Sequence, residues 1–130
     1  MRLRYHGSLL VALMVAPVPS LAEGAVRHLD CTVTRVCAES GSCNAGTGTV
    51  AFSMAPVKTA QDGSGSYEIR YGDKRAPMQA LSGSGPFHWK LGDEQNTLLV
   101  NSESELLWHV LDLARSPRAS IRFLSCRYRQ

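Results

Sequence analysis

The chain has 130 residues, with 14 Lys and Arg against 11 Asp and Glu, and 44% of its residues are hydrophobic. This length allows one domain with a modest core and leaves little room for a second domain. The composition is too apolar for a disordered chain. Residues 23–130 carry 12 basic and 11 acidic residues, a net charge of +1, which argues against a nucleic-acid-binding surface.

The first 22 residues have the three parts of a secretory signal peptide. Arg2 and Arg4 supply the positive start, residues 9–16 form an apolar run, and residues 20–22 place small side chains at a cleavage site. An apolar run this short cannot cross a hydrocarbon layer of about 30 Å. We therefore expect cleavage, export to a periplasm or to the outside of the cell, and no membrane anchor. Residues 23–130 would form the mature domain.

The four cysteines predict two disulfides, because an even set of cysteines in an exported chain is normally paired. If the first strand is extended, Cys31 and Cys37 lie about 20 Å apart, too far for a disulfide without a sharp bend. Residues 38–42 have turn composition, so Cys37 can pair with Cys43. The remaining pair, Cys31 and Cys126, then joins the first strand to the last. No cysteine or histidine spacing indicates a metal site, and we expect no cofactor.

The mature sequence is a series of short, strand-like runs separated by Gly, Ser, Pro, Asn and Asp. The runs cover residues 27–36, 48–54, 67–71, 76–81, 87–91, 97–100, 105–113 and 120–128. The connections are too short for crossover helices, so consecutive strands should pair antiparallel.

The run near residue 110 also fits a helix over 103–114, but its neighbours and short loops favour a strand. About eight sequential strands suggest an all-β, up-and-down antiparallel barrel, in which the last strand pairs with the first. The Cys31–Cys126 disulfide would hold this closure together. A half-open sheet or a sandwich is the alternative fold.

No catalytic motif is present, and we expect a protein without enzymatic activity. His28 and Asp30 fall on one face of the first strand and would be the acid–base pair of a hydrolase, which is one alternative function. A second alternative is a lipocalin-type carrier of a small apolar ligand. Its cavity would be lined by Phe52, Tyr67, Tyr71, Trp89, Trp108 and Phe123.

The C-terminal region is rich in arginine and could present a basic stripe to an anionic partner. The arginines are Arg115, Arg118, Arg122, Arg127 and Arg129. Acidic residues lie just upstream, namely Glu103, Glu105 and Asp112. We therefore interpret this region as a solvated face on which the charges neutralise one another.

Residues 81–94 form the most unusual stretch, because a Ser-Gly loop leads directly into aromatic residues, a lysine and a Gly-Asp-Glu turn. Functional residues concentrate on loops that a rigid sheet supports. We expect a macromolecular partner to contact the loop region 82–94. The predicted partner-binding residues are Ser84, Trp89, Lys90, Asp93 and Glu94.

At these residues the chain resembles the periplasmic and lipid-anchored inhibitors of c-type lysozyme. Those small barrels also pair an early cysteine with a late one and carry a Ser-Gly loop followed by an aromatic-Trp run and Lys-Gly-Asp-Glu. The resemblance implies that Ser84 and Lys90 enter a lysozyme cleft and engage its catalytic carboxylates. Pro86 follows where the family carries tyrosine, and Leu91 separates Lys90 from Gly92. The expected protein is an inhibitor-like binding module, present as a monomer or weak dimer.

Overall fold

The computed structural model describes residues 24–114 and 118–129, and this part of the chain is all-β. The predicted signal peptide, residues 1–22, lies outside the described residues. The strands are β1 (Arg27–Ala38), β2 (Cys43–Ala45), β3 (Thr49–Thr59), β4 (Gly65–Tyr71), β5 (Lys74–Ala80), β6 (Phe87–Leu91), β7 (Glu94–Val100), β8 (Glu105–Asp112) and β9 (Arg118–Arg129). No helix long and apolar enough to cross a membrane occurs within the described ranges.

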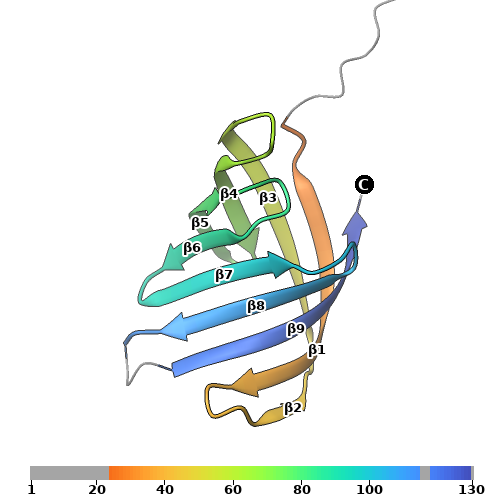
Figure 1. The fold of residues 1–130 in the computed structure, drawn as a ribbon, viewed down its shortest axis with the longest axis vertical. Helices are drawn as coiled ribbons and strands as arrows, with labels where there is room; N and C mark the ends of the chain where they lie inside the picture. Colours follow the sequence, from red (N-terminus) through yellow and green to blue (C-terminus); the bar gives the residue numbers. More distant parts are fainter. Residues whose placement is uncertain (1–23, 115–117, 130) are drawn as a thin grey trace, which may run out of the picture.

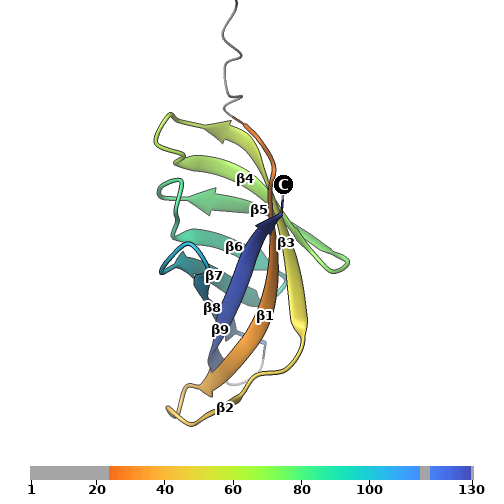
Figure 2. The ribbon, with the colours of Figure 1, turned by 90° about the vertical axis from the view of Figure 1, so that its right-hand side faces the viewer.

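Consecutive strands pair antiparallel from β3 to β9, and β1 pairs with both β3 and β9. Eight strands thus form a closed up-and-down barrel, as the sequence predicted, and β1 lies between β9 and β3 (Figure 2). The short β2 is an addition to this plan. It pairs with the last residues of β1, beyond Thr32, where the pairing of β1 with β3 stops. β1 and β2 form a hairpin at one end of the barrel (Figure 1).

Both predicted disulfides are present. Cys31 and Cys126 are register partners on β1 and β9, and their disulfide joins the two strands that close the barrel. Cys37 and Cys43 are register partners in the β1–β2 hairpin and form the second disulfide. No cysteine of the described chain is free.

The interior is formed by alternate residues of each strand, as the two-residue period of a strand requires. On β8, Leu106, Trp108 and Val110 are buried, which settles this segment as a strand with one face toward the core. The rings of Phe52, Tyr71, Trp89 and Trp108 pack in one cluster, with centroids 5.3–6.4 Å apart. Two buried indoles also donate hydrogen bonds, Trp89 to the Tyr71 hydroxyl at 3.2 Å and Trp108 to the Asn96 Oδ1 at 3.0 Å. The barrel interior at this level is filled by side chains.

One irregularity changes which residues of β1 face inward. Val33 pairs with Leu124 but Arg35 pairs with Phe123, so Thr34 is an extra residue in the ladder. This β-bulge shifts the alternation by one position. Val36 therefore faces the interior opposite Arg122, whereas Arg35 and Phe123 lie on the outer wall.

The antiparallel order gives the barrel two distinct ends. The connections after β3, β5 and β7 lie at one end, together with the start of β1 (Figure 1). The connections after β1, β4, β6 and β8 lie at the other end. We call the first end the loop end and the second the mouth.

Candidate functional site

The predicted partner-binding stretch is divided between the two ends of the barrel. Residues 81–86 connect β5 to β6 at the loop end, whereas the turn containing Asp93 connects β6 to β7 at the mouth. Between them β6 crosses the barrel wall. The prediction required Ser84, Asp93 and Glu94 to share one contact surface. The structure instead places Ser84 at the opposite end of the barrel from the other two.

Trp89 was wrongly predicted as a surface contact. It is 4% exposed and packs in the interior cluster, because Phe87, Trp89 and Leu91 occupy the inner face of β6. Lys90 alternates with them and is exposed on the outer wall. Asp93 is exposed in its turn, and Glu94 is half-buried at the start of β7.

The connection over residues 81–86 is an ordered loop. Within it, the Ser82 hydroxyl donates to the Gly85 carbonyl at 2.6 Å, and the backbone N–H of Gly85 donates to the Ser82 carbonyl at 3.0 Å. The Ser84 N–H donates to the Ser82 hydroxyl at 3.3 Å. These bonds hold Ser84 at the exposed tip.

This loop is also tied to the neighbouring turn over residues 60–64. The Gly83 N–H donates to the Asp62 carbonyl at 2.8 Å, and the Arg27 guanidinium at the start of β1 donates to the Gly83 carbonyl. Tyr67 donates its hydroxyl to the Gly63 carbonyl at 2.7 Å, anchoring the turn to the core. Three segments far apart in the sequence are thus joined by hydrogen bonds into one surface at the loop end.

The electrostatics of this turn are set by Asp62. Its carboxylate accepts hydrogen bonds from the Ser64 hydroxyl at 2.6 Å and from the Ser64 N–H at 3.0 Å. The side-chain bond from Ser64, followed by the backbone bond, lowers the pKa of Asp62 below its ordinary value of 3.8. The turn therefore carries a negative charge at neutral pH.

The loop end also exposes apolar surface. Leu81 is 67% exposed, directly before the Ser-Gly loop. Single exposed leucines are common on protein surfaces. Here the leucine directly precedes Ser82, in a loop whose backbone is held in place by hydrogen bonds.

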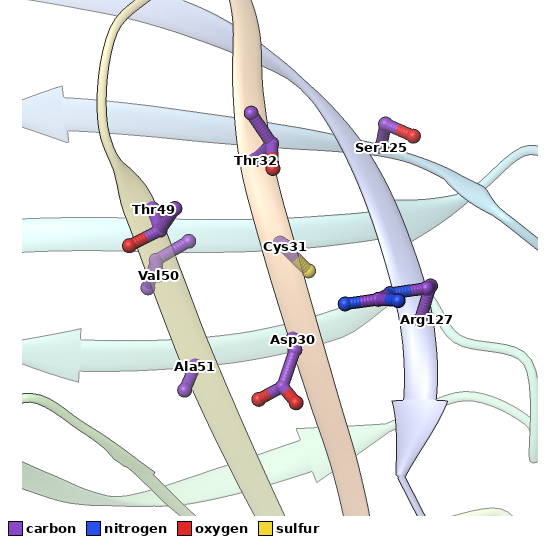
Figure 3. Close-up of a pocket in the computed structure, with 8 residues that line it drawn as sticks. All are labelled: Asp30, Cys31, Thr32, Thr49, Val50, Ala51, Ser125 and Arg127. Atoms are coloured by element: carbon purple, nitrogen blue, oxygen red, sulfur yellow. The ribbon is translucent and has the colours of Figure 1, made fainter.

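A separate groove of about 420 Å³ lies on the outer wall along the closure of the barrel (Figure 3). Asp30 and Thr32 on β1, Thr49 on β3, and Ser125 and Arg127 on β9 line it. It offers hydroxyls and charges to solvent but no imidazole. His28 is not among the residues that line this groove.

The hypothesis of a hydrolase depends on His28 and Asp30, and the arrangement of these two residues does not support an acid–base pair. Both lie on the outer face of β1, and no hydrogen bond joins them in the described structure. The Asp30 carboxylate instead lies 3.8 Å from the guanidinium of Arg129. Asp30 is therefore not positioned to orient the imidazole. Among the described residues, no group of three or more His, Cys, Asp or Glu side chains is arranged to hold a metal ion.

The hypothesis of a lipocalin-type carrier requires open space inside the barrel for a small apolar ligand. Five of the six predicted lining residues are indeed inside, but Phe52, Tyr71, Trp89 and Trp108 pack against one another and Tyr67 packs against Phe87. Phe123 faces outward, because it precedes the inward-facing Leu124 on β9. The interior at this level is thus packed core, as in small barrels whose side chains fill the lumen. Nothing in this arrangement favours a carrier.

The C-terminal arginines, interpreted from the sequence as part of one solvated face, are divided by the alternation of β9. Arg118 and Arg122 have the inward parity and line the mouth, whereas Arg127 and Arg129 lie on the outer wall. Arg115 lies outside the described residues. Sequence reasoning missed the inward arginines, although the two-residue spacing from Leu124 and Cys126 already placed them on the inner face.

Comparison of the chain with protein-family models, with curated proteins and with solved structures gives no match.

Proposed function

We propose that this chain is an exported, non-catalytic binding protein that contacts a macromolecular partner through the loop end. The observation that carries the proposal is the hydrogen-bonded junction between residues 60–64, residues 81–86 and Arg27. A surface that is ordered before it meets its partner loses little conformational entropy on binding. Export is inferred from the composition of residues 1–22 and is compatible with the two disulfides.

Leu81 and Ser84 are the residues expected to make the contact. Leu81 offers apolar area to bury, and the Ser84 hydroxyl offers both a donor and an acceptor. An apolar centre with a polar rim is the usual anatomy of a protein–protein interface.

A c-type lysozyme is the first partner to test, because the resemblance of the Ser-Gly loop to lysozyme inhibitors implies it. Of the two residues with an implied role, Ser84 is exposed at the tip of the loop end, which supports the proposal, whereas Lys90 lies on the outer wall. Phe87 and Lys90 are about 10 Å apart along the extended β6, and Ser84 lies beyond Phe87. The two catalytic carboxyls of a retaining glycosidase are only about 5 Å apart. Lys90, on the outer wall, is therefore not expected to reach them together with Ser84.

The test is inhibition of a c-type lysozyme in a cell-wall lysis assay, using the mature protein in molar excess. We expect the wild type to inhibit lysis and Lys90→Ala to inhibit it equally well. A Leu81→Asp/Ser84→Arg variant should lose at least about tenfold in apparent affinity, which corresponds to about 1.4 kcal/mol of lost contact. Lysis at the uninhibited rate would remove lysozyme as the partner. Equal inhibition by wild type and loop variant would remove the loop end as the contact surface.

A further inference from the structure

The mouth of the barrel holds a second, chemically different cavity at the end opposite the loop end. Its volume is about 390 Å³, within the range of small-molecule sites. Inner-face residues of β1, β2, β7, β8 and β9 line it, including Val36 and Val110. The bulge in β1 is what brings Val36 to this inner face. The cavity therefore has an apolar side formed by the two valines.

Four charged side chains line the same cavity. Glu94 is the register partner of Asp112, and Asp112 is the register partner of Arg118, so these three form one row across β7, β8 and β9. Directly opposed residues have Cβ atoms about 5 Å apart, and two carboxylates in that position repel each other. Arg118 opposes Asp112 from the other side, so the row of two carboxylates and one guanidinium keeps a net charge of −1, which a ligand cation would neutralise.

Arg122 lies deeper in the cavity. It is the register partner of Trp108, and its guanidinium lies over the indole, 4.5 Å from the ring centroid. Stacking on the indole holds the planar guanidinium in place and leaves its edge N–H groups able to bind a carboxylate in a bidentate manner. None of the salt bridges in the described part of the chain includes Arg122, Arg118, Glu94 or Asp112.

The cavity thus has two charged levels, the row that contains Asp112 and the deeper position of Arg122 beside Trp108. Four residues along β8, from Trp108 to Asp112, separate them by about 13 Å. Side chains reaching into the cavity shorten the gap that a ligand must span. An extended peptide spans up to about 3.5 Å per residue, so two or three residues cover about 7–11 Å. A ligand of this length with a cation at one end and an anion at the other matches both levels.

We propose that the mouth binds a short zwitterionic peptide of two or three residues with free termini. Its ammonium lies between Glu94 and Asp112, its carboxylate pairs with Arg122, and its small apolar side chains contact Val36 and Val110. Capture of free peptide termini by fixed polar groups is a recurring mode of recognition. This site is separate from the loop end and does not depend on the function proposed for that surface.

The test is calorimetric titration of the mature protein with trialanine, N-acetyl-trialanine and trialanine amide. We expect trialanine to bind and each blocked peptide to bind at least about tenfold more weakly, because each lacks one charge. Arg122→Gln should remove the preference for a free carboxylate, and Glu94→Gln should weaken the preference for a free ammonium. Arg127→Gln, the same substitution on the outer wall, should leave all three affinities unchanged.

Arg122→Lys keeps the charge without the planar fork and serves if Arg122→Gln does not fold. It should bind trialanine less tightly than the wild type. The proposal is overturned if trialanine shows no heat of binding at about 10 mM, a concentration well above that needed for a millimolar site. It is also overturned if the blocked peptides bind as well as trialanine, or if Arg127→Gln weakens binding as much as Arg122→Gln.

Discussion

Removing the Cys31–Cys126 disulfide should destabilise the protein far more than removing the Cys37–Cys43 disulfide. The first disulfide closes a segment with a sequence separation of 95 residues, and the second closes one of 6. In the chain-entropy account, these loops correspond to about 4.7 and about 2.2 kcal/mol at 25 °C. Cys31 and Cys126 are also buried, so their replacement removes packed sulfur atoms as well.

The expected difference is large relative to the total stability of a small domain, about 5–15 kcal/mol. Urea unfolding of Cys31→Ala/Cys126→Ala and of Cys37→Ala/Cys43→Ala measures it, with the free energy of unfolding taken by linear extrapolation. The first variant should be the less stable of the two by at least about 2 kcal/mol. If the hairpin variant is equally or more destabilised, the reasoning that the long loop dominates is refuted.

Two further predictions concern the loop end and the outer wall. Gly63 has φ of +79°, and a methyl group there would collide with the Gly83 backbone, so Gly63→Ala should weaken partner binding while the barrel stays folded. Gly72 is the control, because it has φ of +58° but no atom within 4 Å of an added Cβ. Gly72→Ala should lower the stability of the fold by a similar amount, about 1 kcal/mol, without affecting binding. Equal losses of binding in the two variants would contradict this prediction. The hydrogen bond from Arg70 is the main cause that lowers the pKa of Glu68 below its ordinary value of 4.5. The ionised Glu68 carboxylate therefore stabilises the folded state fully above pH 4.5, and this stabilisation is lost as the pH falls through the folded-state pKa of Glu68. Glu68→Gln should remove this contribution from the pH dependence of the free energy of unfolding, measured by urea unfolding.

Much of the fold follows from short-range patterns in the sequence. Alternation and short turns predicted sequential antiparallel strands, and the spacing of the cysteines predicted the closure between the first and last strands. The short β2 was not predicted, because Cys43–Ala45 has too few residues to show a period. The extra residue at Thr34 was not predicted either, since a bulge is visible only against the partner strand.

The candidate site was predicted less well, because a contiguous sequence was treated as a contiguous surface. A strand crosses the barrel, so Ser84 and Asp93 end up at opposite ends although nine positions separate them in the sequence. The burial of Trp89 could have been inferred from its alternation with Phe87. The junction between Gly83 and Asp62 could not, since it depends on how two separate turns meet in three dimensions.

The location of the partner surface is the central claim, and amide hydrogen exchange with and without a c-type lysozyme tests it most directly. We expect protection on complex formation to be confined to residues 60–64 and 81–86, with unchanged exchange near Lys90 and Glu94. Protection centred on the outer wall or on the mouth, or no protection at any amide, would contradict the assignment of the loop end as the contact surface.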